Sequence, residues 1–265
     1  MEKYLLKNMY VCHKYALFMK FPIFQLINLG VILIVLVFLI RYLWDLFFGT
    51  GYAPVEWEQA RKLGLISRKL LKLEKNYPDK IRFFNWWLQI ERLKRENIPG
   101  DFAEVGVYKG KSASVLHHMD PLRKFHLFDT FTGFPSRDLA HETGEAATYT
   151  PDRFSDTHVA DVLTKISGNL NLILHPGYFP DTAEKVSNEK FALVNLDADL
   201  YQPTKAALEF FYPRLSPGGI IFIHDYNHKW QGIKKAVNEF AGNIPETLVL
   251  MPDLDETCMI VKNKL

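Results

Sequence analysis

The sequence predicts an α/β protein in which a doubly wound, mainly parallel sheet of seven strands follows an apolar N-terminal helix. Short apolar runs alternate with helix-forming segments from residue 101 onward, as they do in proteins built on a parallel sheet. These runs are continuously apolar, which is typical of strands covered on both faces. Glycines and acids follow several of them, at the sheet edge where such folds bind ligands.

The composition is that of a folded domain with an extension. The chain has 265 residues, 48% of them hydrophobic, and a net charge of +2. This charge is too close to neutral to indicate nucleic acid as a partner. The two cysteines, Cys12 and Cys258, match no metal-ligand spacing and argue against a disulfide framework. The composition leaves the oligomeric state open.

An apolar run at residues 21–40 is the first distinctive element, and only Gln25 and Asn28 in it are strongly polar. About 20 apolar residues cross a bilayer as a helix. Residues typical of the membrane interface follow it: Arg41, Tyr42 and Trp44. We expect a basic segment at 1–20 and a transmembrane or membrane-inserted helix at 21–48. One alternative is a buried core helix. A signal peptide is a weaker alternative, because the apolar run is too long and starts too late.

A helical linker or subdomain is expected at 49–99, with two amphipathic helices within residues 57–96. The apolar stripe of the first recurs every three or four residues: Leu63, Ile66, Leu70 and Leu73. Pro78 separates the two helices. The many basic residues here form either a solvated face or a surface that rests on anionic lipid.

Seven strands and five helices are expected in the domain at 100–265. The strands are Phe102–Val107, Phe125–Asp129, Leu170–Leu174, Phe191–Asp197, Gly219–Asp225, Thr247–Met251 and Cys258–Val261. The helices are Ser112–Met119, His158–Ile166, Thr182–Val186, Thr204–Arg214 and Ile233–Phe240. The last two strands flank the polar turn at Pro252–Glu256 and are expected to pair as a hairpin.

The connection at Thr130–Thr157 is unusually long. Compact domains rarely keep such loops unless they act as lids or binding loops, so we expect either a lid or a disordered segment. His141 in this loop is a reserve candidate for a catalytic base, with an exposed loop residue as the more ordinary interpretation.

The most informative motif lies at residues 102–112, where an apolar strand is followed by two glycines and the start of a helix. Such units bind nucleotides at the carboxyl end of the strand. The spacing E-x-G-x-x-x-G differs from the G-x-G-x-x-G of pyrophosphate-binding loops, and Glu104 would repel a phosphate. Glu104, Gly106, Gly110 and Ser112 therefore indicate a site for a cationic nucleoside such as S-adenosylmethionine (SAM). A turn that binds no ligand is the alternative.

Acids end three further strands. Asp129 follows the second strand, where an acid binds ribose hydroxyls in nucleotide-binding sheets, although a helix cap is the alternative. Asp197 and Asp199 follow the fourth strand, and His224 and Asp225 follow the fifth.

Neighbouring strand ends lie about 5 Å apart, so Asp197, His224 and Asp225 are expected to converge. Carboxylates suit Mg²⁺, and a histidine widens the choice to Mn²⁺, Fe²⁺ or Zn²⁺. A polar rim without metal is the alternative. Because side chains alternate along a strand, one of Asp197 and Asp199 is expected to act in the site and the other to cap or pair.

With these motifs, residues 100–261 resemble the macrocin-type (TylF-like) O-methyltransferases, which are SAM-dependent, metal-assisted enzymes that methylate sugar hydroxyls. The resemblance rests on five runs in family order: 102–112, 128–135, 177–182, 196–201 and 218–226. It implies a SAM-type Rossmann-like fold of seven strands with an antiparallel last strand. The membrane segment and residues 1–56 lie outside it.

The resemblance also implies roles for particular residues. It implies a SAM site lined by Glu104, Gly106, Ser112 and Asp129, with Gly177–Asp181 near the adenine. Asp197 matches the family's metal-binding acid, which is also its proposed base. His224 departs from the pair of acids that is common at this position, so the identity of the metal, and the need for one, stay open.

We therefore expect a SAM-dependent O-methyltransferase that acts on a hydroxyl of a sugar or glycan-type acceptor. Asp197 would be metal ligand and base, Asp225 a second ligand, and His224 a third ligand or alternative base, with Mg²⁺ as the first choice of metal. The apolar helix suggests an acceptor at the membrane, such as a lipid-linked sugar.

Two observations disagree about the side of the membrane on which the catalytic domain lies. Residues 1–20 hold four lysines and residues 41–60 only Arg41, which by the positive-inside rule places the main domain outside the cytoplasm. SAM is a cytosolic metabolite, which favours a cytoplasmic catalytic domain, and a monotopic helix in one leaflet reconciles the two. We expect a single-pass or monotopic membrane protein with its catalytic domain in the cytoplasm.

Two other functions are weighed. A catalytically silent, membrane-tethered binding module is the main alternative, because a fold does not fix a function. A dinucleotide-dependent oxidoreductase fits less well, because it would have a third glycine in the loop and no acid at position 104.

Overall fold

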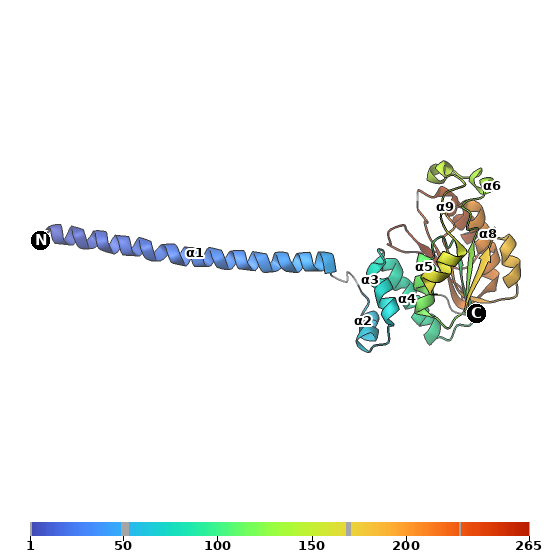
Figure 1. The fold of residues 1–265 in the computed structure, drawn as a ribbon, viewed down its shortest axis with the longest axis horizontal. Coiled ribbons are helices and arrows are strands. Elements are labelled where there is room, and N and C mark those ends of the chain that lie inside the picture. Colours follow the sequence, from blue (N-terminus) through green and yellow to red (C-terminus); the bar gives the residue numbers. More distant parts are fainter. Residues whose placement is uncertain (1, 49–52, 168–170, 228, 265) are drawn as a thin grey trace. The chain divides into compact units, whose positions relative to one another are not determined.

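The computed structural model describes residues 2–48, 53–167, 171–227 and 229–264. The chain divides into two compact units, residues 1–51 and 52–265. The first unit is the helix α1 (Glu2–Phe48), which Figure 1 shows in blue. The second holds every other helix and strand described here.

Helix α1 contains a stretch, Pro22–Trp44, that is long and apolar enough to cross a membrane. None of this stretch is buried within the protein, and its mean hydropathy is 2.9. A core helix would bury such residues, so this structure gives no support to the core-helix alternative. Length and composition alone do not separate a membrane anchor from a signal sequence.

The second unit begins with three helices where the sequence predicted two. They are α2 (Val55–Lys62), α3 (Arg68–Asn76) and α4 (Lys80–Arg95). The prediction was wrong because Gly64 adopts a φ of 71°, which ends α2. Ser67 then starts a new helix, because its hydroxyl accepts a hydrogen bond from the amide of Leu70 at 3.1 Å. Pro78 separates α3 from α4, as expected.

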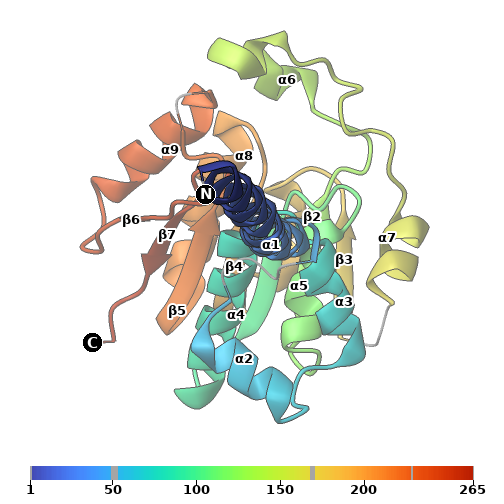
Figure 2. The ribbon, with the colours of Figure 1, turned by 90° about the vertical axis from the view of Figure 1, so that its left-hand side faces the viewer.

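The sheet has seven strands in the order β3-β2-β1-β4-β5-β7-β6, which can be followed in Figure 2. The five parallel strands are β1 (Asp101–Val105), β2 (Phe125–Asp129), β3 (Leu172–Pro176), β4 (Phe191–Leu196) and β5 (Leu215–Ile223). β6 (Val249–Leu250) and β7 (Cys258–Val261) form an antiparallel hairpin, and β7 pairs antiparallel with β5. The predicted fold is therefore confirmed. Leu170, expected at the start of β3, lies outside the described residues.

Helices cover both faces of the sheet. On one face α2, α3, α4, α5 (Lys111–Met119) and α7 (Val159–Ile166) share a core with residues such as Phe102 and Phe222. On the other face α8 (Tyr201–Phe211) and α9 (Gln231–Ala241) pack on residues such as Val105 and Ile223. The segments between the sheet and these helices include two short 3₁₀ turns, Asp181–Val186 and Tyr212–Arg214, the first of which was expected as a helix. The expected domain boundaries at 49 and 100 stay predictions.

The 130–157 connection is ordered. It contains a short helix, α6 (Ser136–Leu139), and a 3₁₀ turn at Gly144–Thr148. Tyr149 in it is buried with Leu200 at the start of α8, and its hydroxyl accepts a hydrogen bond from the indole of Trp230 at 2.9 Å. The expectation of disorder is wrong, because this segment has its own small core.

Candidate active site

A cavity of about 530 Å³ lies at the carboxyl ends of the parallel strands. Residues that follow β1, β2, β3, β4 and β5 all line it, together with parts of the 130–157 connection. We call the side formed by residues 106–109, Lys111, Ser112, Asp129 and 177–179 the cradle wall. The opposite side, the acid wall, is formed by Asp197, Asp199, His224, Asp225, Asp255 and Arg82.

Gly106 joins the two walls. Its φ is 88°, and a Cβ atom here would lie 1.8 Å from the carbonyl oxygen of Asp197. No other residue fits, because the loop after β1 crosses directly over the end of β4. The glycine lets the loop that leads from β1 to α5 pack against the end of β4, and a strand–glycine loop–helix unit of this kind cradles nucleotides.

Asp129 organises the cradle wall through backbone hydrogen bonds. Its Oδ2 accepts hydrogen bonds from the amides of Val107 and Tyr108, both at 2.8 Å, and its Oδ1 accepts one from Phe131 at 2.7 Å. The acid therefore holds the loop and lines the cavity, and it does not cap α5, whose N-cap is Gly110. A carboxylate has about four acceptor positions, so one stays available for a ribose hydroxyl.

Three of the predicted cofactor residues do not line the cavity. Glu104 is fully buried beneath the loop and accepts a hydrogen bond from Asn195 at 2.9 Å. Burial raises its pKa to about 8, so this carboxyl is mainly uncharged at pH 7 and does not present a charge to a ligand. Gly110 forms the N-cap of α5 with a φ of 67°, and Asp181 is exposed, 3.9 Å from Arg137. Gly106, Ser112 and Asp129 do line it.

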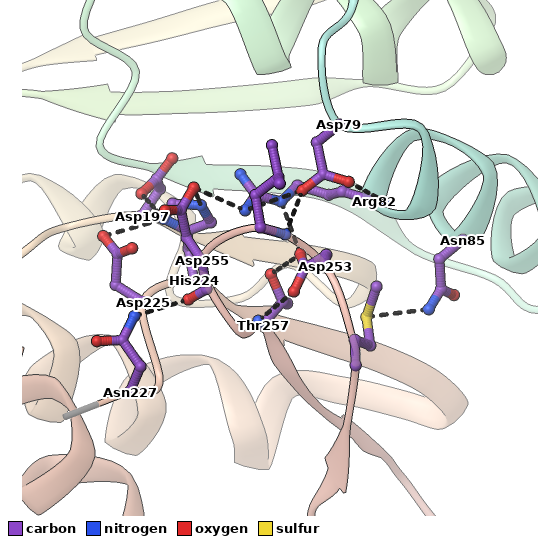
Figure 3. A network of polar contacts seen from close by, with 12 residues as sticks. Asp79, Arg82, Asn85, Asp197, His224, Asp225, Asn227, Asp253, Asp255 and Thr257 are labelled. Carbon is purple, nitrogen blue, oxygen red and sulfur yellow. Dashed lines mark hydrogen bonds and ion pairs between the residues drawn. The ribbon is translucent and has the colours of Figure 1, made fainter. Parts of the chain in front are cut away.

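The acid wall brings together the three predicted metal ligands (Figure 3). His224 Nδ1 lies 2.9 Å from Asp197 Oδ1 and 3.1 Å from Asp225 Oδ2. The ligand atoms of the three residues all lie within 4.8 Å of one another. Asp225 and Asp199 both have a φ of 60°, an uncommon conformation for residues with a side chain that often marks functional sites.

This arrangement fits a divalent cation. Ligands about 2.1 Å from a metal in octahedral geometry lie about 3 Å from one another, which matches the two short distances. His224 Nδ1 is close to two carboxylates yet is aligned for a hydrogen bond with neither, and Asp225 Oδ1 is also buried without a hydrogen-bond partner among the described residues. A ligand set of two carboxylates and one imidazole suits Mn²⁺, Fe²⁺ or Zn²⁺ better than Mg²⁺, which prefers oxygen ligands.

The charges of the acid wall divide its acids into two kinds. Burial by itself raises the pKa of Asp197, but His224 and Arg82 outweigh it and lower that pKa. Burial and then the charges of Asp197 and Asp225 raise the pKa of Asp199 well above its usual range. The pKa values of Asp197 and Asp199 are thus shifted in opposite directions, a separation typical of acid–base sites.

His224 responds to the same carboxylates. Burial alone would lower its pKa, but Asp197, Asp225 and Asp255 outweigh burial and raise it well above 6.5. This shift in pKa favours the protonated imidazole, whose charge offsets part of that of the acidic cluster. A metal would have to displace this proton, because metal-bound histidine is neutral.

Sequence reasoning missed two members of the acid wall. Arg82 on α4 contacts Asp253 Oδ2 at 2.9 Å and Asp255 Oδ2 at 3.4 Å, and Asp255 lies 3.7 Å from His224 Nε2 (Figure 3). Both acids belong to the turn between β6 and β7. The only available signal was that acids occur in this turn, and hairpin turns commonly hold acids. His141, the reserve base, is exposed and does not line the cavity.

Comparisons with known proteins agree with this geometry. Residues 79–262 match the family model described as Macrocin-O-methyltransferase (TylF). A Streptomyces olivaceus 8-demethyl-8-(2,3-dimethoxy-alpha-L-rhamnosyl)-tetracenomycin-C 4'-O-methyltransferase is 31% identical over 171 residues, which are 58% of this chain and 62% of the relative. The mycinamicin III 3''-O-methyltransferase of Micromonospora griseorubida is 31% identical over 156 residues, 52% of this chain and 59% of the relative. The chain thus spans about six tenths of the length of these relatives.

Two solved structures share the fold. The O-methyltransferase NovP matches with a TM-score of 0.60 and 24% identity, over 69% of this chain and 80% of that one. CalS11, a calicheamicin methyltransferase, matches with a TM-score of 0.54 and 24% identity, over 80% of this chain and 94% of that one. The family match covers more than half of the chain, so the chain belongs to the macrocin O-methyltransferase family.

Proposed function

We propose that this member of the macrocin O-methyltransferase family transfers a methyl group from SAM to a hydroxyl of a sugar or glycan-type acceptor. The observation that carries the proposal is the cavity in which a glycine cradle lies directly against an ionised acid, joined at Gly106. By its name, the Streptomyces olivaceus relative methylates a rhamnosyl compound, which supports a sugar as acceptor.

The cradle wall would hold SAM through backbone and short side chains. Gly106 lets the loop pack against the end of β4, Ser112 offers a hydroxyl at the start of α5, and Asp129 has one acceptor position left for the ribose. SAM, when bound, supplies an electrophilic methyl group on a positively charged sulfur.

Asp197 is the proposed base. A sugar hydroxyl holds its proton tightly, and a carboxylate within hydrogen-bond reach takes it as the new bond forms, which is typically worth about 10²–10⁴ in rate. Holding the hydroxyl oxygen in line with the methyl group lowers the barrier further. His224, in contact with Asp197, is the alternative proton acceptor when it is neutral.

A divalent cation is part of the proposal. Asp197, Asp225 and His224 would hold it, and it would lower the pKa of the acceptor hydroxyl and fix its oxygen. Asp255, 3.7 Å from His224 Nε2, and Arg82, which pairs with Asp255, would balance the charge of the cluster.

Attachment to a membrane through α1 is also proposed. The apolar stretch is 23 residues long and exposes its side chains, which is favourable in lipid and unfavourable in water. The proposal places the catalytic domain in the cytoplasm, where SAM is made, and allows a lipid-linked acceptor. Alkaline carbonate extraction tests the attachment, since an integral protein stays with the membrane, and protease protection of oriented vesicles tests the side.

The test of the activity is a calorimetric titration of SAM into the full chain in detergent, with and without Mg²⁺, followed by a screen of sugar acceptors. We expect SAM to bind and Asp129→Ala to weaken binding by at least about tenfold, because a hydrogen bond to a charged group is lost. No SAM binding under either condition would overturn the proposal. SAM binding without transfer to any acceptor would favour the silent binding module.

A further inference from the structure

Asp138 is a buried acid in the cavity with an unused oxygen. It lies on α6, its side chain is 2% exposed, and it lines the cavity. The hydroxyl of Tyr178 donates a hydrogen bond to its Oδ1 at 3.0 Å, whereas its Oδ2 is buried and has no partner among the described residues. A buried carboxylate oxygen without a donor is costly, so this oxygen is expected to meet a donor from a ligand.

The place of Asp138 along the sheet edge indicates which part of a ligand it meets. Its partner Tyr178 directly follows β3, and the sheet runs β3-β2-β1-β4. The reacting methyl group must lie at Asp197, at the end of β4, and the ribose at Asp129, at the end of β2. A nucleoside that passes from β1 across β2 therefore extends its base toward β3, where Tyr178 and Asp138 lie.

The segment that carries Asp138 is fixed on both sides. Glu142, four residues later, accepts a hydrogen bond from the amide of Tyr201 at 2.6 Å, which caps α8 from a distant part of the chain. Arg137 stacks on the Tyr178 ring, with its guanidinium 3.7 Å from the ring centre. The carboxyl of Asp138 is thus held in place before any ligand arrives, which lowers the entropy cost of binding.

We propose that Asp138, oriented by Tyr178, accepts a hydrogen bond from the exocyclic amino group of the adenine of SAM and selects adenosyl over other nucleosyl ligands. The proposal rests on SAM being the methyl donor. A purine with a carbonyl oxygen in place of the amino group would turn an acceptor toward Asp138 Oδ2, and two acceptors repel each other.

The test compares two nucleosides and two variants by calorimetry, with the full chain in detergent. The probes are S-adenosylhomocysteine and S-inosylhomocysteine, in which a carbonyl replaces the amino group. Wild type is expected to bind the adenosyl compound at least about tenfold more tightly, the worth of one hydrogen bond to a charged group. Asp138→Asn keeps the acceptor for Tyr178 and places an amide donor on the ligand side, so this preference should vanish or reverse.

Tyr178→Phe provides a second variant that removes only the orienting hydroxyl, and it should reduce the preference severalfold even if Asp138→Asn does not fold. Glu145→Gln, an exposed acid-to-amide change in the same segment, is the matched control and should leave both affinities unchanged. An unchanged preference in Asp138→Asn or, where that variant is unfolded, in Tyr178→Phe would overturn the inference. Failure of wild type to bind either compound would instead overturn SAM as the donor.

Discussion

The two walls of the cavity are built by different means. The cradle wall is mainly backbone: a glycine with a positive φ, loop amides that Asp129 binds, and the first turn of α5. The acid wall is made of side chains from α4, the ends of β4 and β5, and the β6–β7 turn. The difference indicates that the cradle wall depends mainly on the loop after β1 and the residue that binds its amides, whereas the acid wall depends on side chains that only the fold brings together.

The largest effect should come from the acid wall. Asp197→Asn keeps the shape of the side chain but removes its charge and its capacity as a base, so the transfer rate should fall at least about 100-fold. SAM affinity should change by less than about threefold, because the cradle wall is intact. Single-turnover rates and calorimetry check both. A comparable loss of SAM affinity would show that the two walls do not act separately.

The next largest effect is expected at Gly106, where the two walls meet. Gly106→Ala places a Cβ against the backbone of Asp197, so it should weaken SAM binding and lower the free energy of unfolding by about 3 kcal/mol or more, the sum of overpacking and an unfavourable φ. Gly64→Ala is the matched control, because Gly64 has a φ of 71° but nothing within 4 Å of a Cβ atom.

Gly64→Ala should cost only about 1–2 kcal/mol for its φ and leave SAM affinity unchanged. Thermal unfolding and calorimetry of the two variants check this pair. Equal destabilisation by both would mean that the contact with Asp197 contributes nothing.

A smaller effect is expected at the rim of the acid wall. Asp255→Asn weakens the contacts to His224 Nε2 and Arg82 but leaves the three proposed metal ligands in place. Because the Asp255 side chain is 45% exposed, the apparent affinity for Mg²⁺ should fall by about tenfold or less, the lower end for groups that orient ligands. Measuring the methyl-transfer rate as a function of Mg²⁺ concentration gives this apparent affinity. An unchanged Mg²⁺ concentration at half-maximal rate would show that Asp255 does not support the metal site.

The last effect concerns stability rather than activity. Burial raises the pKa of Glu104 to about 8 from a usual value of 4.5. Between these pH values the folded state keeps a proton that the unfolded state has lost, so the free energy of unfolding falls as pH rises, by at most about 1.4 kcal/mol per unit, and levels off above pH 8.

Glu104→Gln can keep the hydrogen bond from Asn195 and has no proton to lose, so its stability should depend less on pH across this range. Urea unfolding at pH 5.5, 7 and 8.5 compares the two proteins. Parallel pH profiles would show that Glu104 is ionised in the folded state.

Local sequence patterns were sufficient for the parts of this protein that depend on neighbouring residues. The strands β2 and β7 were predicted to the residue, because their apolar runs are bounded by clear turns. Gly106 and Ser112, which line the cavity, could be singled out because they lie in one segment whose conformation is set by glycine. The apolar stretch of α1 needed only length and composition.

The tertiary structure alone decided the rest, because contacts between distant segments carry no local signature. It placed Glu104 under the loop instead of in the cavity, and it brought Arg82 and Asp255, 173 residues apart, to one side of His224. It also gave Asp197 and Asp199 opposite pKa shifts, because burial and neighbouring charges act through space. Residue types and their spacing determine which chemical groups the protein has. Packing determines which of these groups are charged, which are buried and which lie close enough to act together.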